Sequence, residues 1–453
     1  MPKLKKKTRQ MQPSRMLVLG FSIIILAGAT LLFLPISSKS GQFSSFIDCL
    51  FTATSATCVT GITVLDTFNY FNGFGQGVIL ALIQVGGLGF LTLVTFINLI
   101  LGKKLGWSTV KIAASDLTDN ALETTPKRLF YEIVLYSFAI EFVGSVILSF
   151  VFVPDFGALG IFEAIFLSVS AFCNAGFDLF GQFGAYSSLV PYVHNYYVQA
   201  VVMFMIIAGG LGFMVWVELI QYPKKRKLSL HARVVLIFSV LLWVGGAALI
   251  GLMEWNNPAT MGGLSVPGKI MASLFQSVST RTAGMNTIDL AACGPITKLL
   301  MSVLQFIGAA PGSTGGGVKV TTFAVLFLTI RSVAQGRDDC VIADHHIESK
   351  TVYRALTIIV IGAVAAFGSA VVVYYNTAET VSVIDCIFES CSAFGTVGLS
   401  VGVTGQLNTG AKLLYMACMF MGRVGPVSLA ISLTAKPDDN KRKVLPVGHI
   451  NVG

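Results

Sequence analysis

The sequence predicts an all-α polytopic membrane protein in which four copies of one helix–half-helix–helix unit surround a single axis. Three observations support this fold class: an apolar composition, eight long apolar segments and an internal repeat. Of the 453 residues, 54% are hydrophobic and 12% are charged, whereas soluble domains have about 25% charged residues. With a mean hydropathy of +0.77, the chain is not a soluble globular protein, whose surface needs far more polar side chains.

Eight apolar segments are long enough to cross a membrane as helices, which takes about 20 residues each. An even number of spans places both ends of the chain on the same side. We expect spans at 16–34, 78–101, 129–153, 197–220, 234–253, 299–330, 355–375 and 413–433.

Four shorter apolar segments lie between the two spans of each pair. They cover 46–56, 161–172, 270–279 and 383–394 and are too short to span. Such lengths are typical of re-entrant half-helices, whose exposed backbone ends must be buried in protein or line a wet cavity.

The four half-helices repeat with matching detail. Each is followed by a glycine, and Gly61, Gly176, Gly284 and Gly398 are spaced 115, 108 and 114 residues apart. The residue thirteen positions before the glycine is acidic in three units (Asp48, Glu163 and Asp385), and Met271 replaces it in the third. This repeat predicts a pseudo-fourfold arrangement. We divide the chain into a basic N-terminus (1–14), repeats at 15–110, 111–225, 226–340 and 341–435, and a C-terminal tail (436–453).

The basic residues predict the orientation. Segments 1–16, 102–128, 222–233, 331–354 and 436–443 hold 24 of the 31 Lys and Arg residues. Cytoplasmic loops carry such an excess, so we expect a multi-pass plasma membrane protein with both termini in the cytoplasm and half-helices that enter from outside. Ten acids fall on the outer side, where they would attract cations. For Asp48, Glu163 and Asp385, an equally open interpretation is that they cap the half-helices.

The loops after the half-helices are the candidate ion-binding site. A half-helix that enters from outside directs its partially negative C-terminus toward the membrane centre, and a ring of carbonyl oxygens can replace the water around an alkali cation. Glycine suits such loops because it reaches backbone angles that other residues avoid. The candidate filter loops are Thr57-Cys58-Val59-Thr60-Gly61, Phe172-Cys173-Asn174-Ala175-Gly176, Thr280-Arg281-Thr282-Ala283-Gly284 and Phe394-Gly395-Thr396-Val397-Gly398.

These motifs resemble the Trk/Ktr/HKT superfamily of potassium transporters over residues 15–435. Thr396-Val397-Gly398 is similar to the start of the potassium-channel filter, and eight spans without an additional N-terminal pair are most like KtrB-type membrane subunits of the bacterial Ktr system. The resemblance implies a potassium-channel-like fold and uptake of K⁺ that is often Na⁺-dependent. It also implies a homodimer on a cytosolic ring of nucleotide-binding RCK-domain (KtrA-like) subunits. No organic cofactor and no metal other than the transported ion is expected.

Glycines in the second spans of the units form a further set. We interpret Gly86-Gly87-Leu88-Gly89 and Gly209-Gly210-Leu211-Gly212 as positions of close helix packing, and Gly422 takes the matching place in the fourth unit. In the third unit, a helix cannot continue through Pro311 and the surrounding glycines. The family places a gating loop at this point, which here comprises Gly308, Ala309, Ala310, Pro311, Gly312, Ser313, Thr314, Gly315, Gly316 and Gly317.

Three charged side chains within the apolar regions carry separate hypotheses. A cation inside a span is costly and usually functional, so we expect Arg423 to contact the gating loop and tune the barrier to cations; the alternative is a structural Arg bonded to helix-end carbonyls. We expect Arg281 to point away from the axis toward an acid behind its loop. Glu141 is expected to partner a polar group between helices, with a proton or sodium relay as the alternative.

Other classes of function fit less well. The gating loop lacks the Gly-Lys-Ser/Thr of a phosphate-binding loop, no His/Asp/Ser set suggests an enzyme, and the basic charge belongs to cytoplasmic loops and to contacts with lipid or an acidic partner rather than to nucleic acid. The eight cysteines show no CxxC pair and are expected to be small apolar fillers. The main alternative is a secondary symporter of another solute, for which inverted repeats would be typical.

Overall fold

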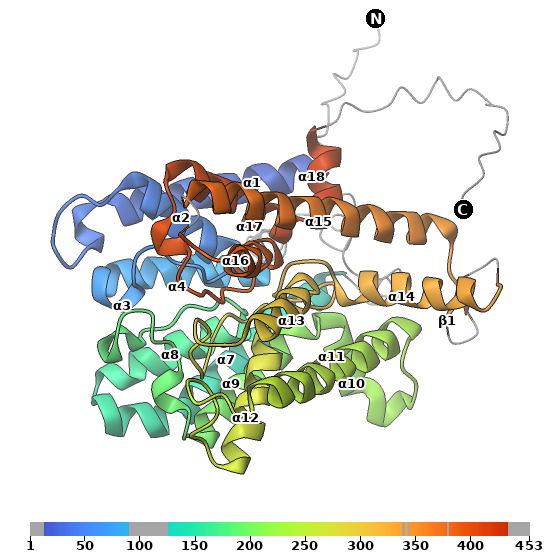
Figure 1. Ribbon diagram of the computed structural model, residues 1–453, viewed down its shortest axis with the longest axis horizontal. Helices are drawn as coiled ribbons and strands as arrows, with labels where there is room; N and C mark the ends of the chain where they lie inside the picture. The colour runs from blue at the N-terminus through green and yellow to red at the C-terminus, as the bar shows by residue number, and fades with distance from the viewer. Residues whose placement is uncertain (1–12, 90–125, 338–339, 343–344, 378–379, 434–453) are drawn as a thin grey trace, which may run out of the picture.

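A computed structural model of the chain describes residues 13–89, 126–337, 340–342, 345–377 and 380–433. The predictions for the basic N-terminus, for the loop at 102–125 and for the tail at 436–453 lie outside these residues. The described residues form a bundle of helices that run mostly along its longest axis (Figure 1). The strands among them, β1 (Val341–Ile342) and β2 (His345–His346), pair in one antiparallel ladder.

The first helix of each unit is long, apolar and continuous, as predicted. These helices are α1 (Pro13–Phe33), α7 (Pro126–Phe156), α11 (Leu230–Glu254) and α15 (Ser349–Asn376). Each contains a stretch of at least 19 residues with a mean hydropathy of 2.0 or more. At 1.5 Å per residue this is enough to cross the hydrocarbon core.

The four predicted half-helices are present and end next to the filter loops. They are α2 (Phe46–Thr57), α8 (Leu159–Phe172), α12 (Val266–Ser279) and α16 (Val383–Gly395). Each packs against the long first helix of its own unit. A phenylalanine stands ten positions before the loop glycine in three of the units. These residues, Phe51, Phe166 and Phe388, are completely buried, which explains why they recur.

More of the second helices are broken than expected. Only the break in the third unit was expected, yet the helices predicted at 197–220 and 413–433 are also interrupted. For the span predicted at 78–101, the helix ends before Gly89, and residues 90–101 lie outside the described residues. The pieces are α4 (Gly73–Leu88), which ends at Gly89, α9 (Tyr196–Gly210) with α10 (Phe213–Lys225), α13 (Pro295–Phe306) with α14 (Val320–Ala334), and α17 (Thr409–Val424) with α18 (Pro426–Leu433). Among the described residues, four continuous helices can therefore span a membrane, or five if α9 and α10, which meet at 101°, are one span.

The glycine clusters cause these breaks. Gly89, Gly212 and Gly425 have φ angles of 81°, 90° and 90°, in a region that other residues avoid and that no α-helix contains. The expected close packing is also present: a methyl group on Gly86, Gly209 or Gly422 would lie 2.1, 1.8 or 1.9 Å from a carbonyl oxygen at the end of a half-helix. The clusters thus bring the second helices against the filter loops and also end them there.

The units close into a ring. The second helix of each unit contacts the half-helix of the next, through α4 with α8, α9 with α12, and α13 with α16, and α17 returns to α2. Short elements cover the predicted outer end: α3 (Thr67–Tyr70) and the 3₁₀ turns η1 (Pro35–Ser37), η3 (Phe180–Phe183), η4 (Val190–Tyr192) and η5 (Thr404–Gln406). All eight cysteines are buried and none forms a disulfide, as expected of small apolar fillers.

Candidate functional site

The four glycines that end the filter loops meet around one axis. A methyl group on three of them would collide with a backbone oxygen of the next loop: at 2.6 Å from Ala175 for Gly61, at 2.2 Å from Val397 for Gly284 and at 2.3 Å from Thr60 for Gly398. On Gly176 it would lie 3.1 Å from the Ala283 oxygen, which is tight, and φ there is positive. The order 61, 176, 284, 398 and back to 61 closes a ring. Residues spaced more than 100 positions apart therefore form one constriction that only glycine fits.

The four loops share one backbone conformation. The glycines have φ angles between 71° and 101°, and the residues two positions earlier, Val59, Asn174, Thr282 and Thr396, have φ angles of 57°, 56°, 73° and 51°. Non-glycine residues rarely adopt positive φ, and such residues persist only where surrounding structure holds them. A backbone that alternates between left-handed and other angles turns successive carbonyls toward the same side, as a cation-coordinating loop requires.

Serines at the ends of the half-helices hold these loops. The Ser55 hydroxyl accepts from Gly61 N at 3.0 Å, Ser170 from Phe177 N at 3.0 Å, and Ser392 from Gly398 N at 3.1 Å. In the third unit, Ser279 instead donates to the carbonyl of Met285. These serines were not among the residues predicted from the sequence, although a serine six positions before the glycine recurs in three of the four units.

Several buried hydroxyls at the site have no hydrogen-bond partner within the part of the chain that the structure describes. They belong to Thr57, Thr60, Thr282 and Thr396. A buried polar group without a partner is costly, so such groups mark places where a ligand or water completes the bonding. Oxygen atoms are the ligands that alkali cations prefer, and the residues at this site fit such an ion.

The gating loop lies directly against the inner end of the filter loops. Methyl groups on Gly315 and Gly316 would lie 2.1 and 2.3 Å from the hydroxyl oxygens of Thr282 and Thr396. The Thr314 hydroxyl donates to the carbonyl of Phe172 at 3.1 Å. The loop is therefore in contact with three of the four filter loops.

Backbone hydrogen bonds tie the gating loop to neighbouring units. Ala310 N and Thr314 N donate to the carbonyls of Gly210 and Gly209 at 3.0 and 3.2 Å, and Gly317 N donates to Gly422 O at 3.2 Å. The loop thus uses carbonyls that the breaks in the second helices leave without a helical partner.

Arg423 contacts the gating loop, as expected. Its guanidinium donates to the carbonyl of Thr314 in the loop, and also to the carbonyls of Gly86 and Gly87 at the end of α4. Both interpretations of this residue are therefore correct in part, because it binds the loop and helix-end carbonyls at once. It connects the first, third and fourth units immediately below the filter.

The expected acidic partner of Arg281 is absent from the described residues. The Arg281 side chain is 4% exposed, and its Nη2 donates to the carbonyl of Gly308 at 2.6 Å. Its Nε and Nη1 have no partner. The prediction of an acid is wrong because the start of the gating loop offers a carbonyl at this point, so Arg281 joins its filter loop to the gating loop.

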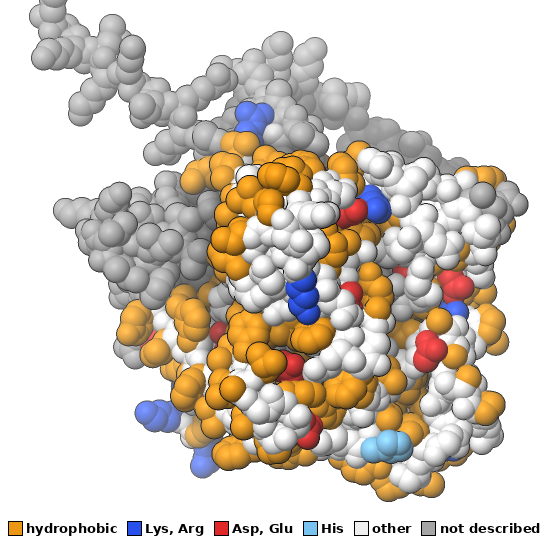
Figure 2. Space-filling model, turned by 90° about the vertical axis from the view of Figure 1, so that its left-hand side faces the viewer, with side chains coloured by type: hydrophobic (Ala, Val, Ile, Leu, Met, Phe, Trp, Pro, Cys, Tyr) orange, Lys and Arg blue, Asp and Glu red, His pale blue; other side chains and the backbone are white. Residues whose placement is uncertain are grey.

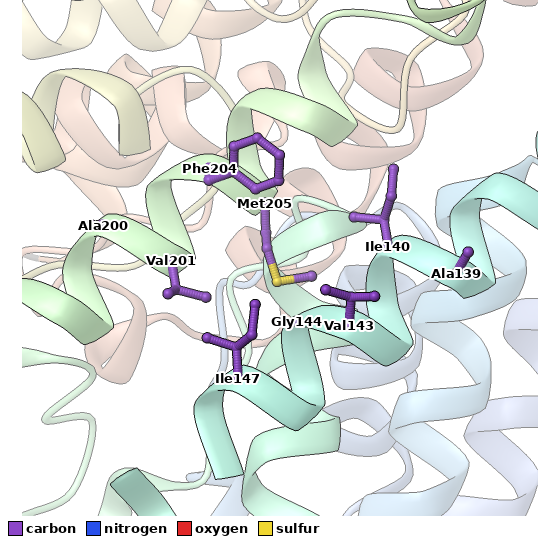
Figure 3. Close-up of a pocket in the computed structure, with 9 residues that line it drawn as sticks. All are labelled: Ala139, Ile140, Val143, Gly144, Ile147, Ala200, Val201, Phe204 and Met205. Carbon is purple, nitrogen blue, oxygen red and sulfur yellow. The ribbon is translucent and has the colours of Figure 1, made fainter. Parts of the chain in front are cut away.

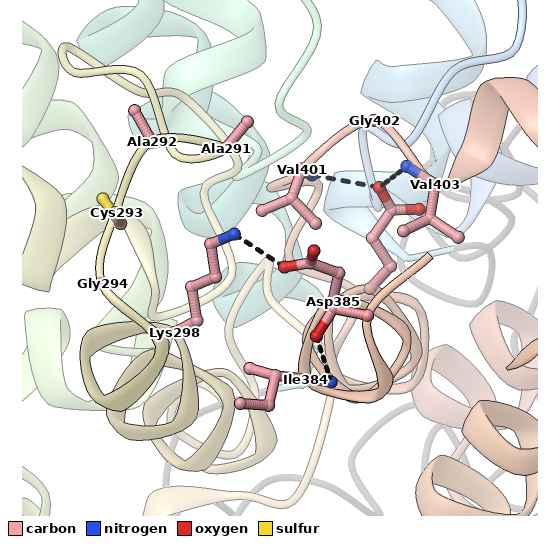
Figure 4. A network of polar contacts seen from close by, with 12 residues as sticks. Ala291, Ala292, Cys293, Gly294, Lys298, Ile384, Asp385, Val401, Gly402 and Val403 are labelled. Atoms are coloured by element: carbon pink, nitrogen blue, oxygen red, sulfur yellow. Dashed lines mark hydrogen bonds and ion pairs between the residues drawn. The ribbon is translucent and has the colours of Figure 1, made fainter. Parts of the chain in front are cut away.

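Two of the three half-helix acids form ion pairs with lysines of the preceding units. Lys412 Nζ lies 2.6 Å from Asp48 Oδ1, and Lys298 Nζ lies 2.7 Å from Asp385 Oδ1 (Figure 4). Asp48 and Asp385 also lie in the first turns of α2 and α16, where the capping interpretation places them. Glu163 lies beyond the first turn of α8 and accepts from Gln182 at 3.2 Å, so the capping interpretation does not hold for it.

Fewer acids face outward than expected. Acidic side chains are spread over the predicted outer face (Figure 2), but Glu254 and Glu389 are 1% and 0% exposed. Glu389 accepts bonds from Val401 N and Val403 N at 3.0 and 2.8 Å (Figure 4). It therefore holds the segment after the fourth filter loop rather than contributing to a surface field.

Asp178 lies on the predicted outer side of the filter loops, two residues after Gly176. It is half-buried, and its Oδ1 accepts from Phe180 N at 3.0 Å. Burial, together with the nearby charge of Asp66, raises the pKa of Asp178 to about 6. The hydrogen bond from Phe180 N lowers this pKa but does not offset the effect of burial. Its charge therefore changes in a physiological pH range.

Glu141 lies behind the second filter loop. It is 4% exposed, and its Oε1 accepts from Gln84 Nε2 at 3.0 Å and lies 3.7 Å from Cys173 Sγ. The expectation of a polar partner between helices is confirmed, since Gln84 belongs to α4 and Glu141 to α7. The thiol of Cys173 adds a direct link to the filter loop.

Comparisons with known proteins agree with this geometry. The profile of the TrkH family, described as a cation transport protein, matches residues 3–443. The potassium/sodium uptake protein NtpJ of Enterococcus hirae is 38% identical over 96% of this chain and 95% of its own. The Ktr system potassium uptake protein B of Bacillus subtilis is 37% identical over 97% of both chains. The crystal structure of the potassium transporter TrkH from Vibrio parahaemolyticus has a similar fold, with a TM-score of 0.70, 21% identity and coverage of 95% of this chain and 86% of that one.

Proposed function

The chain belongs to the TrkH family of cation transport proteins, and from this premise we propose that it is the pore-forming subunit of a potassium uptake system. The observation that carries the proposal is the ring of Gly61, Gly176, Gly284 and Gly398. Four loops with the same alternating backbone angles converge there. Members of this family are cation transporters and not enzymes.

Selectivity for K⁺ would come from the filter loops. Carbonyl oxygens of residues 57–60, 172–175, 280–283 and 394–397 would replace the hydration shell of the ion. The partnerless hydroxyls of Thr282 and Thr396 would complete its coordination at the inner end. The four half-helices direct their partially negative ends toward this point and so favour a cation.

The gate would be the loop from Gly308 to Gly317. It contacts three filter loops from below, so an ion that leaves the filter inward meets it first. Arg423 and Arg281 hold the loop through carbonyls of Thr314 and Gly308. We propose that release of these bonds opens the path, and that the charge of Arg423 adds to the barrier while the loop is closed.

The location and the partners of the transporter are proposed on the basis of the same family. We propose a plasma membrane location with both termini in the cytoplasm, supported by the 24 basic residues in the loops on one side. Relatives named as Ktr system proteins support assembly with other subunits, and we propose a homodimer on a cytosolic nucleotide-binding RCK-domain ring. The relative named as a potassium/sodium uptake protein supports a role of Na⁺ in uptake, and we propose that uptake of K⁺ depends on Na⁺.

Rubidium uptake into proteoliposomes tests this function. Gly398→Ala should abolish uptake because the methyl group meets the Thr60 oxygen at 2.3 Å and φ is 101°. Gly405→Ala in the same unit is the control, because nothing lies within 4 Å of its added methyl group. Uptake of another solute without K⁺ or Rb⁺ transport would contradict the proposal and favour the symporter, although four units of one topology argue against inverted repeats.

A further inference from the structure

An apolar cavity outside the ion pathway lies between α7 and α9 on the perimeter of the second unit. It has a volume of about 410 Å³ (Figure 3), within the range of ligand pockets. Its walls include Ile140, Val143 and Ile147 of α7 and Ala200 and Phe204 of α9. Val143 and Phe204 are 54% and 57% exposed, so the cavity opens onto the outer surface of the bundle.

We propose that this cavity binds one acyl chain of a membrane phospholipid. The lining residues at 139–147 lie in the middle of α7 (Pro126–Phe156), so a spanning α7 places the opening at the depth of the hydrocarbon core. A cavity lined only by apolar side chains does not bind water. Phe150, which is 72% exposed and lies three residues after Ile147, continues the apolar surface of α7 for the rest of the acyl chain.

The floor of the cavity is linked to the second filter loop. The thioether sulfur of Met205 lies 3.5 Å from the Ser168 hydroxyl of α8. That hydroxyl donates to the carbonyl of Glu141 at 2.6 Å, and the Glu141 carboxylate contacts Cys173 of the filter loop. An acyl chain that packs on Met205 therefore supports the half-helix and the loop that follows it.

The packing beneath Met205 leaves little freedom. A methyl group on Gly144 would lie 2.3 Å from the Met205 sulfur and 2.7 Å from the Ser168 hydroxyl. Met205 is therefore packed tightly on the side of Gly144 and Ser168, and a bound acyl chain would pack against it from the cavity side. Loss of the bound acyl chain should loosen the second filter loop, whichever cation the filter selects.

Photolabelling of the full chain in phosphatidylglycerol vesicles tests the site. The probe is phosphatidylglycerol with a diazirine on one acyl chain, and labelled peptides are mapped by mass spectrometry. We expect the labels to concentrate in the cavity segments of α7 and α9. This labelling should be lost in the variant Ala200→Phe, because the phenyl ring fills the cavity. Ala248→Phe is the control, since Ala248 is an exposed alanine of α11 outside the cavity. Ala139→Phe, from the opposite wall, replaces Ala200→Phe if that variant does not fold.

Two results would overturn the proposal, and a third would overturn its link to the filter. Labels spread evenly over α1, α11 and α15, and unchanged by Ala200→Phe, would show only bulk lipid. Crosslinks between two copies of the chain at Ala200 would show that the face is an interface between protomers. Equal rubidium uptake by Ala200→Phe and Ala248→Phe, with labelling lost only in the first, would refute the link to the filter.

Discussion

Asp48 in the first half-helix forms a 2.6 Å ion pair with Lys412 in α17, so the last unit is joined to the first. Asp385 and Lys298 repeat the pairing between the fourth and third units at 2.7 Å. Both lysines lie ten residues before the first glycine of their helix break, where the first two units have Gln76 and Gln199. The ring is therefore held by ion pairs at two of its four interfaces.

We expect Asp48→Asn and Lys412→Met to destabilise the protein by about 1–2 kcal/mol each, because each leaves a partly buried charge without its partner. The double variant should be less destabilised than the sum of the two. Thermal unfolding in detergent, analysed as a double-mutant cycle, measures the coupling. A coupling of zero would show that the pair contributes nothing to closure of the ring.

We expect Arg423→Gln to raise rubidium uptake, because the variant loses the bonds that join the gating loop to α4. Arg423→Lys keeps the charge but cannot reach three carbonyls at once. Its rubidium uptake should therefore lie between that of Arg423→Gln and that of the natural protein. Uptake by proteoliposomes at equal protein density is the measurement. If Lys and Gln both leave uptake unchanged, Arg423 has no role in gating.

Ser392→Ala should weaken selectivity for Rb⁺ over Na⁺ by about fivefold, because one hydrogen bond of about 1 kcal/mol no longer holds Gly398 N. Competition of Na⁺ with rubidium uptake reports the ratio. Ser149→Ala is the matched control, since this serine is exposed on α7 and bonds only within its own helix. Equal ratios in the two variants would contradict a supporting role for Ser392.

Uptake should fall by about two- to threefold when the outer pH drops from about 7.5 to 5, because protonation of Asp178 removes a charge that attracts cations. The pKa of Asp178 is raised to about 6, so the transition should centre there. Asp178→Asn should lower uptake at high pH and flatten the profile.

The raised pKa of Asp178 also predicts how the stability of the protein depends on pH. A carboxyl whose folded pKa lies above its unfolded value destabilises the protein when ionised, so Asp178 should stabilise it as the pH falls from about 6 to 4. Unfolding of Asp178→Asn should lack this dependence. A pH profile of uptake that is unchanged in the variant would exclude Asp178 as the titrating group.

Glu141→Ala should reduce uptake and stability, because the variant leaves the buried Gln84 amide without its acceptor at a cost of about 1–3 kcal/mol. Glu141→Gln keeps an acceptor oxygen and should retain most of both. If Glu141→Gln instead abolishes uptake while its melting temperature is unchanged, the carboxylate charge is required, which would favour the proton or sodium relay.

The sequence was sufficient to predict the half-helices and the filter glycines. Apolar length separates spans from half-helices, and the glycine spacing of 115, 108 and 114 residues aligns the units. The same alignment contained the serines that hold the loops. By contrast, the clusters at Gly86 and Gly209 were interpreted as packing positions only, because a glycine in an apolar helix is compatible with both packing and a break.

The sequence therefore determined the number of units, their order and the position of the glycine ring, because these depend on composition and on backbone preferences that recur in every unit. The partners of individual charges were decided by the tertiary structure alone. Arg281 binds Gly308, Arg423 binds Thr314 and Gly86, and Lys412 binds Asp48 across 364 positions. The contacts of Arg423 and Lys412 join different units and form only when the ring closes, whereas Arg281 binds within the third unit. The three cations stand at positions where the four units are not all alike, and a repeat pattern cannot assign partners to such positions.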